Sequence, residues 1–249
     1  MSSLHKTRGI ALRVSDYSET SVIARIYTEQ FGMQAYMLKG VKRKKSSVKS
    51  TMLQPMTLLA LNVYHKPGKW LQHVSEMRSE PKLNTIAFDM GKTSIVFLMS
   101  EVISKTIQES ESNKKLFGFI FDSVLLLDKQ DSAGCFNLSF LLHLTSHLGF
   151  FPRENFSAEK KYFNLKEGLF VAQPPAHPHW LNESLSEAFF KLLSTPLEKN
   201  SELQFSSSEK KNIQAALLMY YRLHLEGFKG VHSQKILEEV WSIEEPEKV

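Results

Sequence analysis

The sequence predicts an α+β protein made of a small β-barrel followed by a helical domain. Apolar residues recur with period two over residues 1–80 and with a period of about 3.6 after Pro81. The charges of the 249 residues also divide at this point, with 13 basic and 5 acidic side chains before residue 81 and 18 and 21 after it. We therefore expect one domain over 1–80 and a second over 81–249, with a hairpin and loop insertion at about 152–181.

Five short strands are expected in the first domain. They cover residues 10–14, 22–27, 33–38, 58–64 and 70–74. In the first strand Ile10, Leu12 and Val14 alternate with Ala11 and Arg13, so the two sets are expected on opposite faces. A hairpin loop over 65–69 contains Pro and Gly, and a long polar insertion over 40–52 separates the third strand from the fourth. Five short strands favour a closed barrel, because closure leaves no unpaired sheet edge.

The second domain is expected to be a bundle of helices. Apolar faces with helical spacing cover residues 95–107, 116–127, 138–148, 185–193, 213–224 and 236–241. Three serines at 206–208 followed by Glu209 predict a capped start for the fifth helix.

Residues 152–181 interrupt the helical pattern. Pro152, Gly168 and Pro178 are helix breakers, and Pro174 and Pro175 follow one another. Two short apolar runs, 162–165 and 169–171, flank a Lys-Glu-Gly turn. The pattern predicts a small β-hairpin inserted between the helices.

Composition excludes several classes of protein. No apolar run approaches the roughly 18–20 residues that span a bilayer, and the start of the chain lacks the apolar stretch of a signal peptide. We expect a soluble, cytoplasmic protein. Cys135 is the only cysteine, so an internal disulfide is excluded and the thiol is expected to be buried.

The strongest local signal is a basic run after the third expected strand. Six basic residues lie within eleven positions that contain no acid: Lys39, Lys42, Arg43, Lys44, Lys45 and Lys49. Such a run is typical of a surface that contacts the phosphates of a nucleic acid, although a merely solvated loop would have the same composition.

Further basic and aromatic residues lie near this run in the sequence. Arg8, Arg13 and Arg25 are on the expected strands, and so are three aromatic residues, Tyr36, Tyr64 and Trp70. Small barrels that bind single strands combine a cationic groove with stacking surfaces. For each of the three aromatics, however, the core of the barrel is the expected location.

Signatures of catalysis are missing. The sequence contains no phosphate-binding loop, dinucleotide fingerprint, nucleophile elbow or H-E-x-x-H motif. His143 and His147 share a helix face and His177 lies near His179, but neither pair has a carboxylate or thiolate beside it, so no metal site is expected. The five acids of residues 1–80 are spread over different strands and turns, which disfavours a metal-dependent nuclease. We expect no catalytic residues, no metal and no cofactor.

Taken together, these segments resemble the RecO family of bacterial recombination and repair proteins. The resemblance rests in the first domain on Lys6–Arg13, Tyr17–Thr20, Tyr27–Thr28, Phe31–Gly32, Lys39–Gly40 and Leu53–Pro55. In the second domain it rests on His147–Pro152, Tyr221–His224 and Ser233–Leu237, so that it covers nearly the whole chain. It implies an oligonucleotide-binding (OB-fold) barrel followed by a helical domain.

The resemblance also implies a function. RecO proteins bind single- and double-stranded DNA and anneal complementary strands. With RecR, and often RecF, they help to load RecA on DNA coated with single-strand-binding protein (SSB), whose C-terminal tail they bind. A nucleoid-associated location follows. The DNA-binding residues are expected to be Lys39, Lys42, Arg43, Lys44, Lys45 and Lys49, together with Arg8, Arg13 and Arg25. The alternative is a non-catalytic docking adaptor whose basic loop binds an acidic protein partner.

Two departures from the family pattern matter. Many members carry a four-cysteine zinc element after the segment that ends at Pro152, whereas residues 155–180 contain no cysteine. We expect a variant without zinc, in which this region is held by packing of Phe156, Tyr162, Phe163, Leu169, Phe170 and Trp180. Many members also carry an acidic-basic pair where this chain has Ser21 and Val22, so a DNA contact is not expected there.

Overall fold

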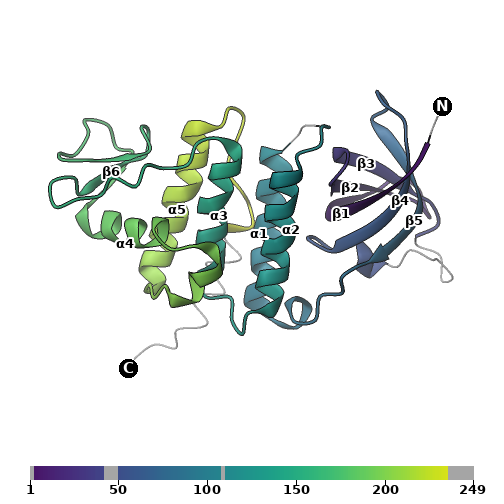
Figure 1. Cartoon of the computed structure of the whole chain (residues 1–249), viewed down its shortest axis with the longest axis horizontal. Coiled ribbons are helices and arrows are strands. Elements are labelled where there is room, and N and C mark those ends of the chain that lie inside the picture. Colours follow the sequence, from purple (N-terminus) through teal and green to yellow (C-terminus); the bar gives the residue numbers. More distant parts are fainter. Residues whose placement is uncertain (1–2, 42–49, 108–109, 235–249) are drawn as a thin grey trace. The chain divides into compact units, whose positions relative to one another are not determined.

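A computed structural model describes residues 3–41, 50–107 and 110–234 (Figure 1). Its first five strands are β1 (Ser3–Asp16), β2 (Val22–Thr28), β3 (Gly32–Leu38), β4 (Leu58–His65) and β5 (Leu71–Ser79). They form a closed barrel in the order β1-β2-β3-β5-β4, in which β3 and β5 are parallel and the other pairs are antiparallel. The expected barrel is confirmed.

The barrel encloses an apolar core with contributions from every strand. Its fully buried residues include Ile26, Tyr36, Leu59 and Val63. Gly9 in β1 fits closely into this core, because a Cβ atom at this position would lie 2.7 Å from Leu61 Cδ1. The side chains of Leu61 and Ile26 therefore fill the space that a side chain at position 9 would need.

The first strand departs from its predicted alternation. Ala11 pairs with Ile26 and Arg13 pairs with Arg25, so Leu12 is an additional residue, a bulge in β1. Ala11 and Val14 pack in the barrel core, and the bulge between them changes which residues face inward. The expectation that Ile10, Leu12 and Val14 share one face was wrong for this reason.

Five α-helices follow the barrel in the described residues: α1 (Met90–Thr106), α2 (Lys114–Lys129), α3 (Phe136–Leu148), α4 (Glu183–Leu193) and α5 (Ser207–His224). Short 3-10 helices cover Ser50–Leu53, Ile86–Phe88 and Leu197–Glu202. All five expected helices before residue 225 are confirmed, and the sixth, at 236–241, lies outside the described residues. None of the described helices is long and apolar enough to cross a membrane.

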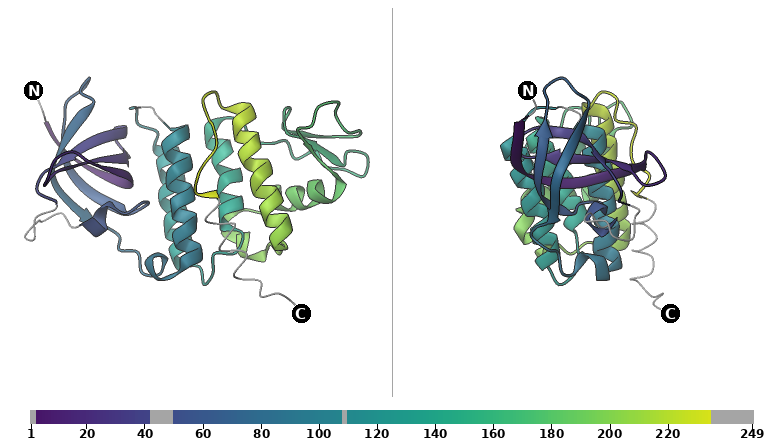
Figure 2. Two further views of the ribbon diagram at one scale, coloured as in Figure 1. Left: turned by 180° about the vertical axis from the view of Figure 1, so that it is seen from behind. Right: turned by 90° about the vertical axis from the view of Figure 1, so that its right-hand side faces the viewer.

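The insertion before α4 forms a small sheet. Strands β6 (Tyr162–Asn164) and β7 (Leu169–Val171) make the expected hairpin, and β8 (Trp180–Leu181) pairs with the other side of β6. The two residues of β8 are too few for a periodic signal, so the sequence did not predict this strand. The sheet lies against α4 (Figure 2).

Tertiary contacts divide the chain into two compact units, Met1–Asp89 with Met99–Lys129 and Met90–Leu98 with Gln130–Val249. Helix α2 therefore groups with the barrel, against which Phe117 packs at 5.9 Å between ring centroids from Tyr27. The boundary expected at residue 80 marks the change from strands to helices. The change in periodicity at that boundary does not reveal that α2 packs against the barrel.

Candidate nucleic-acid interface

Two of the predicted DNA-binding arginines lie side by side on the barrel. Arg13 of β1 and Arg25 of β2 are directly opposite each other in the antiparallel ladder, and both side chains are exposed. Their neighbours Val14, Ala24 and Ile26 belong to the core, so the two guanidinium groups are on the outer face. Among the described residues neither arginine has a carboxylate partner. The pair is therefore available to an external anion.

The row of paired residues continues across the sheet. Arg25 lies opposite Ala35 of β3, and Ala35 lies opposite Leu71 of β5. Trp70 directly precedes Leu71 and is 72 % exposed. A groove of about 720 Å³ follows this row, and its lining includes Ile23, Arg25, Met33, Ala35, Lys69 and Trp70. We call it the hairpin groove, because the β4–β5 hairpin forms one of its sides.

A single buried side chain holds the tip of that hairpin. Gln72 is 2 % exposed, and its Oε1 accepts a hydrogen bond from Lys66 N at 2.9 Å. Its Nε2 donates to Lys66 O at 2.9 Å and to Lys69 O at 2.7 Å. Gly68 has a φ of 76°, which completes the turn. Sequence reasoning did not find Gln72, because a glutamine in a strand has no signature of this role.

The aromatic residues of the barrel do not share one location. Tyr36 is fully buried, as expected, whereas Tyr64 is 43 % exposed. Together with Trp70 it contradicts the expectation of a core position. The physical reason is position in the hairpin: Trp70 lies just outside the strand β5, where the barrel interior has already ended.

Lys39 marks the described start of the basic run. It is exposed directly after the last residue of β3, and Val41 then returns to the barrel core. Leu53 fixes the other end of the insertion in the same core. The other basic residues of the run, Lys42, Arg43, Lys44, Lys45 and Lys49, lie outside the described residues, and their contact with DNA stays a prediction.

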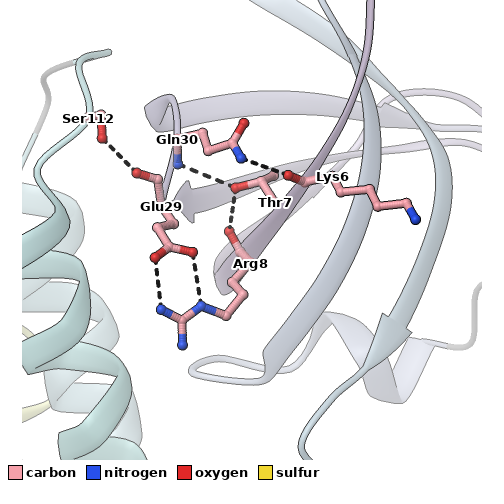
Figure 3. Close-up of polar contacts among 6 residues, drawn as sticks. All are labelled: Lys6, Thr7, Arg8, Glu29, Gln30 and Ser112. Atoms are coloured by element: carbon pink, nitrogen blue, oxygen red, sulfur yellow. Dashed lines mark hydrogen bonds and ion pairs between the residues drawn. The ribbon is translucent and has the colours of Figure 1, made fainter.

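Arg8 has a different environment from Arg13 and Arg25. Its Nε and Nη2 donate to Glu29 Oε2 and Oε1 at 2.9 and 2.8 Å (Figure 3). Its guanidinium also lies over the rings of Phe121 and Phe117 of α2, 4.8 and 5.4 Å from the centroids. The hydrogen bonds from Arg8 lower the pKa of Glu29. Arg8 therefore joins the β2–β3 turn to α2 rather than extending the exposed arginine pair.

The turn that carries Glu29 is held by further polar contacts. Gln30 N donates to Thr7 Oγ1 at 3.3 Å and Gln30 Nε2 to Lys6 O at 2.8 Å, while Ser112 Oγ donates to Glu29 O at 2.7 Å (Figure 3). These bonds place the Glu29 carboxylate beside β1, where Arg8 reaches it.

Comparison with known proteins agrees with this architecture. The family model for the N-terminal domain of recombination protein O matches residues 1–80, and the model for the C-terminal domain matches residues 87–233. The chain belongs to the RecO family. A DNA repair protein RecO from Azobacteroides pseudotrichonymphae is 32 % identical over 96 % of this chain and 99 % of its own. Another from Flavobacterium psychrophilum is 31 % identical over 95 % and 99 %. Membership of the RecO family supports a role in DNA repair.

In this RecO family member the insertion packs through aromatic rings. Phe163 lies 4.5 Å from Phe189 of α4 between ring centroids, and Phe156 stacks on Phe190 at 4.8 Å. Phe163 and Phe170 are buried. The expected packing of this region is confirmed. It extends to Phe189 and Phe190 of α4, which the sequence did not connect with the insertion.

Two histidines of this RecO helical domain lie close to main-chain oxygens. His143 Nε2 is 3.1 Å from Thr195 O, and His224 Nε2 is 2.9 Å from Leu165 O. Over 3–41, 50–107 and 110–234, no three His, Cys, Asp or Glu side chains come together as metal ligands would. Cys135 is buried as predicted, and this burial raises the pKa of its thiol.

Proposed function

We propose that this RecO family member is a mediator of recombinational repair that binds DNA through the outer face of its barrel. It binds single- and double-stranded DNA and anneals complementary strands. With RecR and RecF it helps to load RecA on SSB-coated DNA. The observation that supports this proposal best is the exposed Arg13–Arg25 pair, which has no carboxylate partner in the described part of the chain.

The chemistry of this face suits phosphates. Arginines bind phosphate oxygens through a planar fork of donors, and each cation that replaces condensed counterions adds affinity that falls with salt. Residues 1–80 carry a net charge of +8, which lowers the repulsion between two strands bound at the same face. No bond is made or broken, so no catalytic residue and no cofactor is needed. Electrostatic screening between strands is sufficient for annealing.

Salt dependence of binding tests the DNA-binding step. Bare oligonucleotides, with no protein partner present, are titrated at several salt concentrations, and log K falls linearly with log salt. The slope should decrease when Lys42, Arg43, Lys44 and Lys45 are changed to alanine. It should also decrease after Arg13→Gln and Arg25→Gln. A control variant, Lys160→Ala with Lys166→Ala, removes two exposed charges outside the barrel and should leave the slope unchanged.

Annealing of SSB-coated strands tests the mediator function. Complementary strands are coated with the cognate SSB, either complete or without its C-terminal tail. Acceleration that depends on the tail would support both the function and the partner. If bare DNA is not bound and coated strands are not annealed, the docking adaptor becomes the better description.

A further inference from the structure

Trp70 is an exposed tryptophan beside exposed cations. Trp70 is 72 % exposed and Tyr64 of β4 is 43 % exposed, whereas Tyr27 and Tyr36 of the barrel strands are buried. An exposed tryptophan does not contribute the stabilisation that burial of its apolar ring would give the fold. Arg25 and Lys69 line the same groove as Trp70. The combination is a flat apolar ring with positive charges next to it.

The hairpin groove is a suitable size and composition for a base. A volume of about 720 Å³ exceeds that of one nucleobase and leaves room for the adjoining sugar-phosphate. Met33 and Ile23 contribute apolar surface, and Gln34 and Ser15 contribute polar groups. Protein side chains that bind single-stranded DNA offer this mixture of stacking surface and cations.

The residues before Trp70 are held rigidly. Gln72 binds both ends of the turn through its three hydrogen bonds to Lys66 and Lys69. A ring presented on a fixed backbone loses less conformational entropy when a ligand binds. The buried Gln72 thus fixes the backbone from which the exposed Trp70 ring is presented for stacking.

We propose that Trp70 stacks on a nucleobase of single-stranded DNA, while Arg25 and Lys69 contact the phosphates on either side of that base. This inference rests on the proposed DNA-binding function and names the base-contacting residue of the same surface. In duplex DNA the faces of the bases are already covered by their neighbours. Trp70 therefore distinguishes single strands from duplexes, whereas Arg13 and Arg25 act on both.

The test compares Trp70→Ala and Trp70→Phe in the full chain, at one salt concentration. Three probes of equal length are used: oligo-dT, an oligonucleotide with an abasic tract, and a duplex. We expect Trp70→Ala to weaken binding of oligo-dT by about 5- to 150-fold. Binding of the abasic probe and of the duplex should stay unchanged, and Trp70→Phe should restore most of the loss. Phe88→Ala, which removes another exposed ring of the same compact unit, is the matched control.

The salt slope separates stacking from charge. Trp70→Ala should lower affinity for oligo-dT without changing the slope, because the indole releases no counterions. Equal losses on all three probes, or no loss on oligo-dT, would overturn the stacking inference while leaving DNA binding in place. Absence of binding by the unchanged protein would instead overturn both the function and the inference. A tryptophan that contacts a protein partner would give normal oligo-dT binding in Trp70→Ala.

Discussion

Arg13 lies opposite Arg25 because one residue, Leu12, is bulged out of β1. Without the bulge, Arg13 would have the same inward direction as Ala11, which packs in the barrel core. The bulge therefore turns a charged side chain outward and sets it beside a second one. Bulges often re-aim a side chain at a functional surface.

Removing one charge of this pair should affect DNA binding and stability differently. Like charges directly opposite in a ladder are destabilising, so Arg25→Gln should leave the free energy of unfolding unchanged or raise it by up to about 0.5 kcal/mol. The same change should reduce the salt slope for single strands by about 0.7. Urea denaturation and oligonucleotide titration measure the two quantities. A large loss of stability would show that Arg25 has a structural partner.

Changing Arg8 should lower the stability of the protein and leave the salt slope of DNA binding unchanged. Arg8→Ala removes the ion pair with Glu29 and the contacts with Phe117 and Phe121, and should cost about 1–2 kcal/mol of stability. The salt slope of DNA binding should not change, because this guanidinium is already occupied. Glu29→Gln is the matched variant and should lose the ion pair alone. A slope reduced as much as in Arg25→Gln would instead place Arg8 in the DNA-binding surface.

Asp128 should make stability depend on acid pH. Its carboxylate, at the end of α2, accepts hydrogen bonds from the backbone N–H groups of Asn84, Thr85 and Ile86 at 2.8–3.2 Å. Burial alone would raise the pKa of Asp128, but these bonds and the Thr85 hydroxyl outweigh it and lower the pKa. The folded protein then binds fewer protons than the unfolded chain, so this stabilisation is complete above pH about 4 and is lost as the pH falls through the lowered pKa.

The Asp128→Asn variant isolates this contribution. At pH 7 it should be about 2–3 kcal/mol less stable than the unchanged protein, because a charged acceptor is replaced by a neutral one with fewer lone pairs. The difference between the two proteins should shrink as the pH is lowered below 4. Urea denaturation at a series of pH values provides the measurement, and a difference that does not vary with pH would contradict it.

Gly168 should not tolerate a side chain. Its φ is 67°, and a Cβ atom would lie 2.4 Å from Tyr220 Oη, which donates to Phe150 O at 2.8 Å. Gly149 has a φ of 88° with open space around its Cα, so Gly149→Ala carries only the backbone cost of about 1–2 kcal/mol. We expect Gly168→Ala to be the more destabilising of the two in urea denaturation. Adding Tyr220→Phe, which removes the clashing hydroxyl, should recover part of the difference.

A chelator should not affect the folding of the insertion. Residues 155–180 contain no cysteine, and aromatic packing on α4 holds this region. We expect the same Tm with and without EDTA, and no zinc in stoichiometric amount by elemental analysis of the purified protein. A Tm that falls on chelation would show that a metal contributes to the fold.

The sequence by itself determined the strands, the helices and their order, because these depend on the periodicity of neighbouring residues. The apolar run 58–64 and the capping residues Ser206 and Glu209 are local signals. The run lies in β4, and Ser206 and Glu209 form the expected cap of α5. Membership of the RecO family could also be predicted from the sequence, because it depends on short segments in a fixed order. The two-residue strand β8 was not, because two residues carry no period.

Only the tertiary structure decided how the candidate site is assembled. Arg8 and Arg25 are the same residue type on neighbouring strands. No local sequence pattern shows that Arg8 forms an ion pair with Glu29 whereas Arg25 faces solvent. That difference depends on the Glu29 carboxylate beside Arg8 and on the packing of α2 over its guanidinium. The exposure of Trp70 likewise follows from where the barrel closes, whereas Gln72 acts through short-range bonds within its own hairpin. Closure joins residues far apart in the chain, and a local pattern contains no record of it.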